Sequence, residues 1–475
     1  LNTDYDVLNT RLKLANENWS FSLSSWQNRD AGNGAGSSQA LDPIGSTDAT
    51  FYQFFAAHNG SFNEDWNYEA RFYTSFYEEE NDFVILPAGT IVPIGADGNL
   101  FTGLQPVIFP DGVLGTPGGK EKTNSLEFIN HYSGFNQHNV RLSVGYRLME
   151  SDVNESKNFG PGVIDGSEGV VDGSLTDVSD TPFVFSSDLD RNIKYVSLQD
   201  EWTFARDWEL TVGLRYDDYS DFGSTINPRL ALVWATNYNL TSKLLYGRAF
   251  RAPSIGEQFQ KNNPIILGNS NIDPETIDTI EIAFDFRPNA STATKLNLFA
   301  YEVSDLIDFV PSREFQGAFQ ADNAIDQIGY GFEIEYEVEL SSDLDLHGNY
   351  SWQRSEDKDS DEPVADAPGQ QFYLGINWRL RQNWYLSGQL NWVADRERGP
   401  NDQRPELDDY FSVDMTLRKQ LWAKNFEAAL VAYNLFDENI HEPSAFNNAF
   451  GSNVIEDFPM QGRRVSLELR YKFSN

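Results

Sequence analysis

The sequence predicts an all-β protein, a transmembrane antiparallel β-barrel with about 19 strands. Three observations predict this fold: segments that alternate between apolar and polar side chains recur along the chain, short connections alternate with long ones, and aromatic residues make up 14% of the 475 residues. No run of about 18 apolar residues occurs, which excludes a transmembrane helix. Alternating strands joined in this way are typical of barrels in the bacterial outer membrane.

Each predicted strand has one apolar wall and one polar wall. In residues 464–473, apolar side chains occupy every second position from Val465 to Phe473, with polar and charged ones between them. Phe332 to Leu340 repeats the pattern with four glutamates on one face. Four carboxylates cannot face a dry core without partners, so this face meets water. Successive strand side chains point to opposite faces, and we therefore expect the apolar wall to face lipid.

The connections between these segments sort by length. The short ones, expected to be periplasmic turns, include Glu17-Asn18, Ser61 to Asp65, Arg206-Asp207 and Ser341-Ser342. The long ones, expected to be extracellular loops, include Glu79 to Lys122, Glu150 to Asp190, Asp305 to Asp326 and Ser355 to Pro368. One connection on the long side is short, Asp221 to Thr225. A secreted carbohydrate-binding β-sandwich has no reason to sort its loops in this way, whereas outer-membrane barrels do. We expect strands of about 10 to 13 residues, which match a tilted membrane span.

The odd number of predicted strands indicates where a complete barrel would need further strands. With a periplasmic C-terminus, the last segment runs from the outer face to the inner face, and so does the first, Val7 to Asn16. Single-chain bacterial barrels have an even number of strands. We therefore expect an odd number of strands to be missing before Leu1.

Composition argues against several classes of function. The net charge of −37 argues against nucleic-acid binding, which needs basic patches. The absence of cysteine excludes a disulfide framework and thiol catalysis. Ser355 and Lys358 have the spacing of a serine-lysine acylase, but they lie in an acidic loop with no helix to align them. We expect no enzymatic activity, no cofactor and no metal site.

Three stretches carry more than periodicity. They are Tyr246 to Ser254 with Glu257 and Phe259, Leu267 to Thr276 with Asp278, Thr279 and Glu281, and Asn434 to Glu438 with Pro443, Pro459, Gly462 and Arg463. In this order they resemble the C-terminal half of TonB-dependent outer-membrane receptors. The resemblance covers the whole chain, so residues 1–475 are interpreted as the barrel domain of such a receptor.

The resemblance implies further parts and partners. It implies a barrel of 22 strands, with an N-terminal plug domain in the lumen, and no plug motif occurs in this chain. It also implies active uptake of a scarce nutrient, energised by the inner-membrane TonB complex through the missing N-terminal part. We expect a monomer in contact with outer-membrane lipid and lipopolysaccharide. The alternatives are a passive porin or a structural barrel.

Candidate ligand-binding residues come from the motifs and the long loops. They are Phe250, Arg251, Glu257, Phe259, Phe315, Phe319, His441 and Phe446. Arg251 either pins the loop through hydrogen bonds or a salt bridge, or contacts the ligand directly. Loop aromatics, among them Phe109 and Phe159, are expected to stack on a ligand. Asn434 to Glu438 is expected to close a strand at the outer rim, with an aromatic girdle residue and turn residues.

The ligand is inferred from what the loops contain. Receptors of this family that bind haem typically carry a histidine between the two middle motifs, and Ala252 to Pro274 contains none. A ferric siderophore is therefore the first choice, with haem, cobalamin or an oligosaccharide as alternatives. The loop cations are few, chiefly Lys120, Lys122, Arg313, Arg396, Arg398 and Arg404. Acidic loops with few cations favour a neutral or cationic siderophore over a strongly anionic one.

Overall fold

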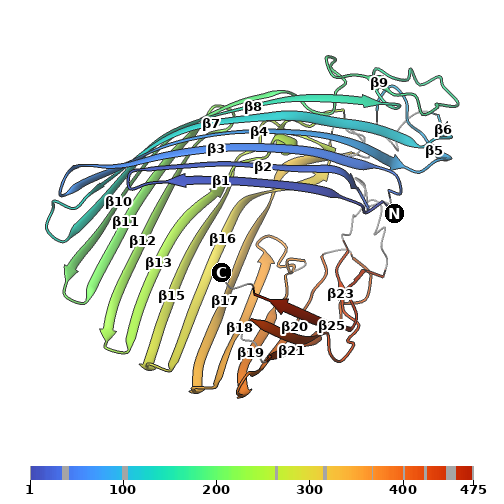
Figure 1. Cartoon of the computed structure of the whole chain (residues 1–475). Helices are drawn as coiled ribbons and strands as arrows, with labels where there is room; N and C mark the ends of the chain where they lie inside the picture. Colours follow the sequence, from blue (N-terminus) through green and yellow to red (C-terminus); the bar gives the residue numbers. More distant parts are fainter. Residues whose placement is uncertain are drawn as a thin grey trace.

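The computed structural model describes residues 2–34, 42–98, 105–262, 266–313, 318–365, 367–399, 402–421, 425–444 and 456–472. Most of these residues form one large, strongly curved sheet of twenty-one strands (Figure 1). Two of its strands, β9 (Thr176–Asp177) and β14 (Ile266–Leu267), have two residues each, which leaves nineteen long strands. This confirms the predicted all-β class and the predicted strand number.

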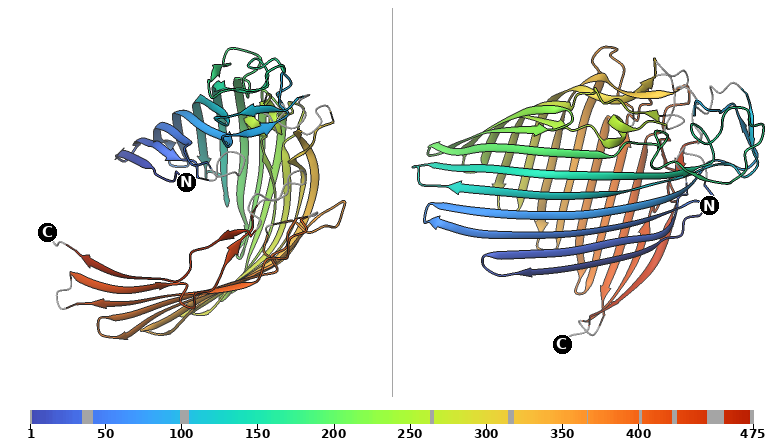
Figure 2. Two further views of the ribbon diagram at one scale, coloured as in Figure 1. Left: turned by 90° about the vertical axis from the view of Figure 1, so that its right-hand side faces the viewer. Right: turned by 90° about the horizontal axis from the view of Figure 1, so that it is seen from above.

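The long strands follow one another in chain order. They are β1 (Asp6–Ala15), β2 (Trp19–Gly32), β3 (Ser46–Asn63), β4 (Trp66–Leu86), β7 (Val113–Tyr132), β8 (His138–Lys157), β10 (Leu189–Ala205), β11 (Trp208–Tyr219), β12 (Gly223–Asn237), β13 (Leu240–Arg251), β15 (Glu275–Asn289), β16 (Thr292–Pro311), β17 (Phe319–Ser341), β18 (Leu344–Asp357), β19 (Gln370–Arg381), β20 (Trp384–Ala394), β21 (Tyr410–Gln420), β22 (Phe426–Tyr433) and β25 (Arg464–Tyr471). Each pairs antiparallel with the next. Figure 2 shows the sheet curving round, with β1 and β25 at its two ends.

Short elements lie in the connections between the long strands. They are the hairpin β5 (Thr90–Val92) and β6 (Val107–Phe109), the pair β23 (His441–Glu442) and β24 (Phe458–Pro459), and the helix α1 (Ile255–Phe259). Among the described residues, no helix is long and apolar enough to cross a membrane.

The two faces of the sheet differ as the alternation predicts. On one face of β10 and β11, Leu198 lies opposite Leu214, and each has 52% of its surface exposed. On the other face, Ser197 lies opposite Arg215. The last strand has the same arrangement, with Leu467 exposed to 69%; Phe473 lies outside the described residues. Exposed apolar side chains on the convex wall are suited to lipid, and the polar concave wall is suited to water.

Short turns join the strands at one end of the sheet, as the sequence predicts. Each predicted short connection falls between two paired strands, for example Arg206-Asp207 between β10 and β11. Aromatic side chains gather near this end, where Trp66 contacts Phe62 and Tyr132, and Trp208 stacks on Trp234 at 4.9 Å between ring centroids. Aromatic belts of this kind lie at a membrane–water interface.

The prediction of strands of about 10 to 13 residues is wrong at the opposite end. β4 has 21 residues and β17 has 23. The predicted loop from Glu79 to Lys122 therefore contains the end of β4 and the start of β7, and Glu150 lies inside β8. Neighbouring strands continue to pair beyond a membrane span, because the backbone hydrogen bonds of the ladder do not depend on lipid.

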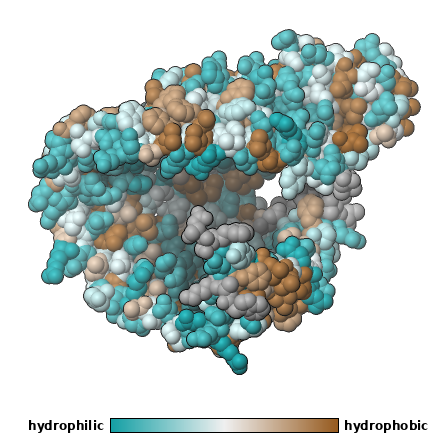
Figure 3. Space-filling view, viewed as in Figure 1, coloured by the Kyte–Doolittle hydropathy of each residue, from teal (hydrophilic) through white to brown (hydrophobic). Residues whose placement is uncertain are grey.

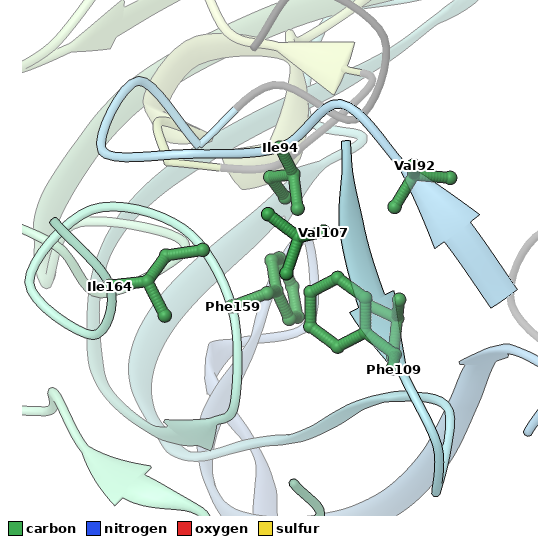
Figure 4. Close-up of a cluster of buried hydrophobic side chains, with 7 residues drawn as sticks. Val92, Ile94, Val107, Phe109, Phe159 and Ile164 are labelled. Atoms are coloured by element: carbon green, nitrogen blue, oxygen red, sulfur yellow. The ribbon is translucent and has the colours of Figure 1, made fainter. Parts of the chain in front are cut away.

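Two of the long connections fold together into a unit that we call the cap. It comprises the described residues 87–98, 105–112 and 158–188, and it lies at the upper right in Figure 1 around β5, β6 and β9. Its core is formed by buried apolar side chains: Val92, Ile94, Val107, Phe109, Val113, Phe159 and Ile164 (Figure 4). Phe109 and Phe159 are almost fully buried there, so the prediction that they stack on a ligand is wrong.

A buried asparagine holds the two connections of the cap together. The amide nitrogen of Asn158 donates to the carbonyl oxygens of Gly112 and Asp172, both at 3.0 Å, and its Oδ1 accepts from the amide of Leu114 at 2.8 Å. Buried backbone groups that lose such partners destabilise a fold. Asn158 is therefore the polar centre of the cap.

We expect Asn158→Ala to loosen the cap without affecting the barrel. The loss of three buried hydrogen bonds should cost about 1–3 kcal/mol locally. Hydrogen exchange should become faster at residues 107–114 and 170–174, while the barrel strands keep their protection. Asn136→Ala, at an exposed turn residue on the other end, is the matched control. Unchanged exchange in the cap would contradict the role of Asn158.

Candidate functional site

Residues 252–274 connect the end of β13 to the start of β15 at the outer rim of the sheet, and we call them the rim segment. At this end, Arg251 donates from Nε to Glu275 at 2.6 Å and from Nη1 and Nη2 to the two oxygens of Glu257 at 2.9 and 3.0 Å. Burial opposes the ionisation of Glu257, but hydrogen bonds from Arg251 and Ser254 outweigh it and lower the pKa of Glu257. Two roles were considered for Arg251, and these hydrogen bonds correspond to the first, in which Arg251 holds the loop in place.

Glu257 also caps the short helix α1. Ser254 Oγ accepts a hydrogen bond from the amide of Glu257 at 3.2 Å, and Glu257 Oε2 accepts one from the amide of Ser254 at 2.7 Å. This reciprocal pair is a capping box, which satisfies two amides that a helix start leaves free. Pro253 comes just before it and ends the strand. The sequence motif from Arg251 to Glu257 therefore encodes a strand end, a turn and a helix start.

A second arginine, Arg191 of β10, clamps the same helix from the side. Its Nη2 donates to Gln258 Oε1 at 2.7 Å, to the Pro253 carbonyl at 3.1 Å and to Asp221 at 2.6 Å. Its guanidinium also lies 5.7 Å from the centre of the Phe222 ring, within the range of a cation–π contact. The sequence analysis missed Arg191. One signal was available, because Arg191 is the first cation after residues 158–190, which contain none.

The cap is tied to the rim segment through a buried lysine. Lys157 is inaccessible to solvent, and its Nζ donates to Glu155 at 3.1 Å and to the Phe183 carbonyl at 2.8 Å. The Asn262 carbonyl lies 3.5 Å away, and the amide of Lys261 donates to Phe185 at 2.8 Å. Burial lowers the pKa of Lys157 and raises the pKa of Glu155. The cap and α1 are thereby joined outside the sheet.

The aromatic candidates lie in different surroundings. Phe250 packs edge-on against Tyr219 at 5.8 Å, and Phe259 is half-buried at the end of α1. Phe319, at the start of β17, is buried and lies beside β14, whose following residue Gly268 donates to the Gln260 carbonyl. The structure thus brings Phe250, Phe259 and the strand of Phe319 to the same rim. Their contact with a ligand stays a prediction. Phe315 and Phe446 lie outside the described residues.

His441 belongs to a separate cluster of loops. Its carbonyl accepts from Arg396 Nη2 at 2.7 Å, and its strand β23 pairs with β24. In the same cluster, Arg398 pairs with Asp457 at 2.5 Å, and Arg404 pairs with Asp402 at 2.6 Å. Arg404 also pairs with Asp457, at 3.1 Å, so the ion pairs of Asp457 join the β20–β21 connection to the β22–β25 connection. The structure does not bring the His441 side chain into the Arg251 cluster.

The turn from Asn434 to Glu438 has the predicted rim structure. The Asn434 side chain donates to the Glu438 carbonyl and accepts from the Glu438 amide, both at 2.8 Å. Asn434 and Asp437 have positive φ angles, of 44° and 61°, which short polar residues tolerate best. Phe436 between them is 61% exposed, as a girdle residue would be.

Polar side chains form a network on the concave wall below the rim. Tyr195 donates from its hydroxyl to Glu127 at 2.6 Å, and Glu127 pairs with Arg71 at 3.1 Å. The Arg215 guanidinium lies 4.0 Å from the centre of the Tyr195 ring and pairs with Asp217 at 2.7 Å. The residues of the network come from β4, β7, β10 and β11, and the Tyr195–Glu127 hydrogen bond passes over β8. It gives the wall a fixed polar surface that suits a hydrated ligand.

A pocket of about 390 Å³ opens at the outer end of β18. Its lining combines Trp352, Arg354 and Ser355 with Asp395 and Glu397 from the connection after β20. Among the described residues, no group of three or more potential metal ligands occurs. The described outer side therefore offers polar and aromatic contacts for a ligand, and no built metal centre.

Comparison with known proteins decides the family. The family described as TonB dependent receptor-like, beta-barrel matches residues 1–435. The chain belongs to this family. Its members are receptors and transporters of the bacterial outer membrane, and the chain is accordingly a TonB-dependent receptor barrel located there.

Individual relatives match about half of this chain at low sequence identity. The "Iron-regulated outer membrane virulence protein" of Vibrio cholerae is 24% identical over 265 residues, 51% of this chain and 40% of the relative. The "Heme/hemopexin utilization protein C" of Haemophilus influenzae is 25% identical over 284 residues, 52% of this chain and 40% of the relative. These matches therefore span less than half of each relative's length.

A solved structure matches over almost the whole barrel. The siderophore receptor PirA from Acinetobacter baumannii has a TM-score of 0.69 at 14% identity, and the match covers 99% of this chain and 71% of that chain. At this level of identity the likeness shows the fold alone. It agrees with the predicted transmembrane barrel.

We expect Arg251→Lys to free the start of α1. Lysine cannot reproduce the bidentate pairing with Glu257 while also reaching Glu275. Hydrogen exchange at residues 254–260 should become at least roughly tenfold faster, which corresponds to about 1.4 kcal/mol. Arg287→Lys, at an exposed arginine paired only with Asp285 in the described part of the chain, is the control and should change nothing at the rim. Equal protection in both variants would mean that Arg251 does not pin the helix.

The ion pairs of Asp457 with Arg398 and Arg404 join two loops, and protonation of Asp457 would weaken them. Hydrogen bonds from Arg398, together with its charge and that of Arg404, lower the pKa of Asp457 to about 2. A carboxyl whose pKa is lower in the folded state contributes stability above its unfolded pKa of 3.8 and loses it as pH falls towards 2. We expect the loops around Asp457 to lose about 2 kcal/mol of local stability between about pH 4 and pH 2.

Limited proteolysis or hydrogen exchange of residues 396–408 across this pH range measures the loss. Asp457→Asn should show reduced protection at neutral pH and no further change on acidification. A wild-type profile in the variant would show that the ion pairs contribute nothing.

Proposed function

We propose that this receptor imports a ferric siderophore, which it binds between its extracellular loops and its lumen. The observation that carries the proposal is membership of the TonB-dependent receptor family, supported by the iron-related names of the matching proteins. The polar concave wall and the aromatic rim around Phe250 are compatible with a hydrated, partly aromatic ligand.

Charge favours a neutral or cationic siderophore complex. The chain carries 72 acidic and 35 basic residues. The predicted loop cations are paired with carboxylates in several cases: Lys120 with Glu78, Arg396 with Glu442, and Arg398 with Asp457. A paired cation attracts an anionic ligand much less than a free one, and the summed field of the acidic surface repels it. A strongly anionic catecholate complex would therefore bind poorly.

Active uptake must couple ligand binding to a source of energy. We propose that a plug domain and the inner-membrane TonB complex supply this step. The chain covers 71% of the siderophore receptor structure it matches, which leaves room for such a domain in the whole protein.

Uptake by cells that carry the complete receptor tests the proposal. Under iron limitation, receptor-dependent uptake of labelled iron should occur from a neutral hydroxamate or a cationic siderophore, and it should stop when the inner membrane is de-energised. Haem, cobalamin and a trianionic catecholate complex are the comparison substrates.

Uptake of haem or cobalamin but not of any siderophore would overturn the proposed ligand class. Uptake that persists without energy would identify a passive porin. Tight binding of the catecholate complex would overturn the inference from charge.

A further inference from the structure

The cap exposes a short row of aliphatic side chains on its outer surface. Ile91 of β5 lies directly opposite Ile108 of β6, and Ile108 is bridged on its other side to Val170. Side chains that face each other across a sheet lie on the same face. All three are exposed, to 61%, 40% and 60% respectively. We call Ile91, Ile108 and Val170 the cap row.

The cap row sits on a rigid support. Its neighbours along the strands, Val92, Val107 and Phe109, point to the opposite face and are buried in the core of the cap (Figure 4). Main-chain hydrogen bonds hold the third segment in place, because Ile108 donates to the Gly169 carbonyl at 3.0 Å and accepts from the Val171 amide at 2.9 Å. The row is therefore a fixed feature of a three-stranded patch, and not the side of a loose loop.

The connections that carry the cap row are acidic. Residues 87–112 and 158–188 contain no lysine or arginine, and their carboxylates are Asp97, Asp111, Asp165, Glu168, Asp172, Asp177, Asp180 and Asp188. Glu168 and Asp172 lie two residues to either side of Val170. Hydrogen bonds from Ser174 hold the pKa of Asp172 below its usual range, so this carboxylate stays charged in mildly acidic medium. Figure 3 shows hydrophobic residues beside hydrophilic ones on the cap, at the upper right.

These features restrict what can cover the row. A second copy of this chain would bring its own Glu168 and Asp172 against the same acidic surface, and like charges across an interface are repulsive. Phosphate-bearing lipid headgroups would be repelled for the same reason. A polypeptide with apolar side chains flanked by lysine or arginine complements both the row and its rim.

We propose that the cap row is a docking surface for a basic polypeptide of the extracellular medium, which places apolar side chains on Ile91, Ile108 and Val170 and cations against Glu168 and Asp172. The surface is separate from the rim cluster around Arg251, and the proposal does not depend on which nutrient the receptor imports. Electrostatic attraction would speed the encounter, and the aliphatic row would give it a fixed position.

Peptide binding to the intact receptor in lipid nanodiscs tests this surface. The probe is a short peptide in which leucine and lysine alternate, and empty nanodiscs give the background. The triple variant Ile91→Ser, Ile108→Ser, Val170→Ser should bind at least about tenfold more weakly, which corresponds to about 1.4 kcal/mol. Leu175→Ser changes an exposed cap leucine outside the row and should leave the affinity unchanged. Glu168→Gln with Asp172→Asn should weaken binding and flatten its salt dependence.

Four outcomes would overturn the proposal. Equal binding of a serine–lysine peptide, or wild-type affinity in the triple variant, would mean that the surface only adsorbs charge. Binding of a leucine–glutamate peptide with the same affinity would remove the role of the carboxylates. Self-association of the receptor that the triple variant abolishes would make the occupant a second copy of the chain. Hydrogen exchange of residues 107–114 confirms that each variant keeps a folded cap.

Discussion

Backbone hydrogen bonding in the absence of water is the constraint on which this structure depends. Inside the hydrocarbon layer an unpaired N–H or C=O costs several kcal/mol, so every residue of a membrane-spanning strand must pair with a neighbouring strand. The seventeen long strands from β2 to β22 meet this constraint by pairing on both sides, whereas β1 and β25, at the two ends of the described sheet, each pair on one side. Because the pairing requirement involves only the backbone, side chains are free to be apolar on the lipid face and charged on the other.

Beyond the membrane the constraint relaxes, and the chain uses that freedom. Water can satisfy loop backbones, so the outer connections vary in length and in structure. One pair builds a hydrophobic core of its own around Phe109 and Phe159. Charge holds described parts of other connections, since Arg251, Arg191 and Arg398 each bind a carboxylate from another segment. The pairs of Arg191 and Arg398 are buried.

The sequence predicted the barrel class, the number of strands and the positions of the short turns, because period-two alternation and turn residues are local signals. It did not predict where β4 would end or where β17 would begin, since pairing continues past the apolar stretch and no residue marks the limit. Nor did it distinguish a loop phenylalanine that contacts ligand from one, such as Phe109, that is buried. That difference depends on residues 92, 159 and 164, which are distant in the chain. Arg251 was recognised through its motif, whereas Arg191 was missed because its partners come from two other segments that are distant in the chain.

The order of the strands also has a kinetic meaning. Every long strand pairs with its immediate neighbour in the chain, so most contacts close small loops of sequence and the topology carries little entropic penalty. Such a sheet can form one hairpin at a time, because each new hairpin pairs with the strand that formed just before it. The contacts that cannot form in this sequential way are those between outer connections, such as Lys157 with the segment around Asn262, which close loops of about a hundred residues. We therefore expect the strands of the barrel wall to pair first and the contacts between the outer loops to form last.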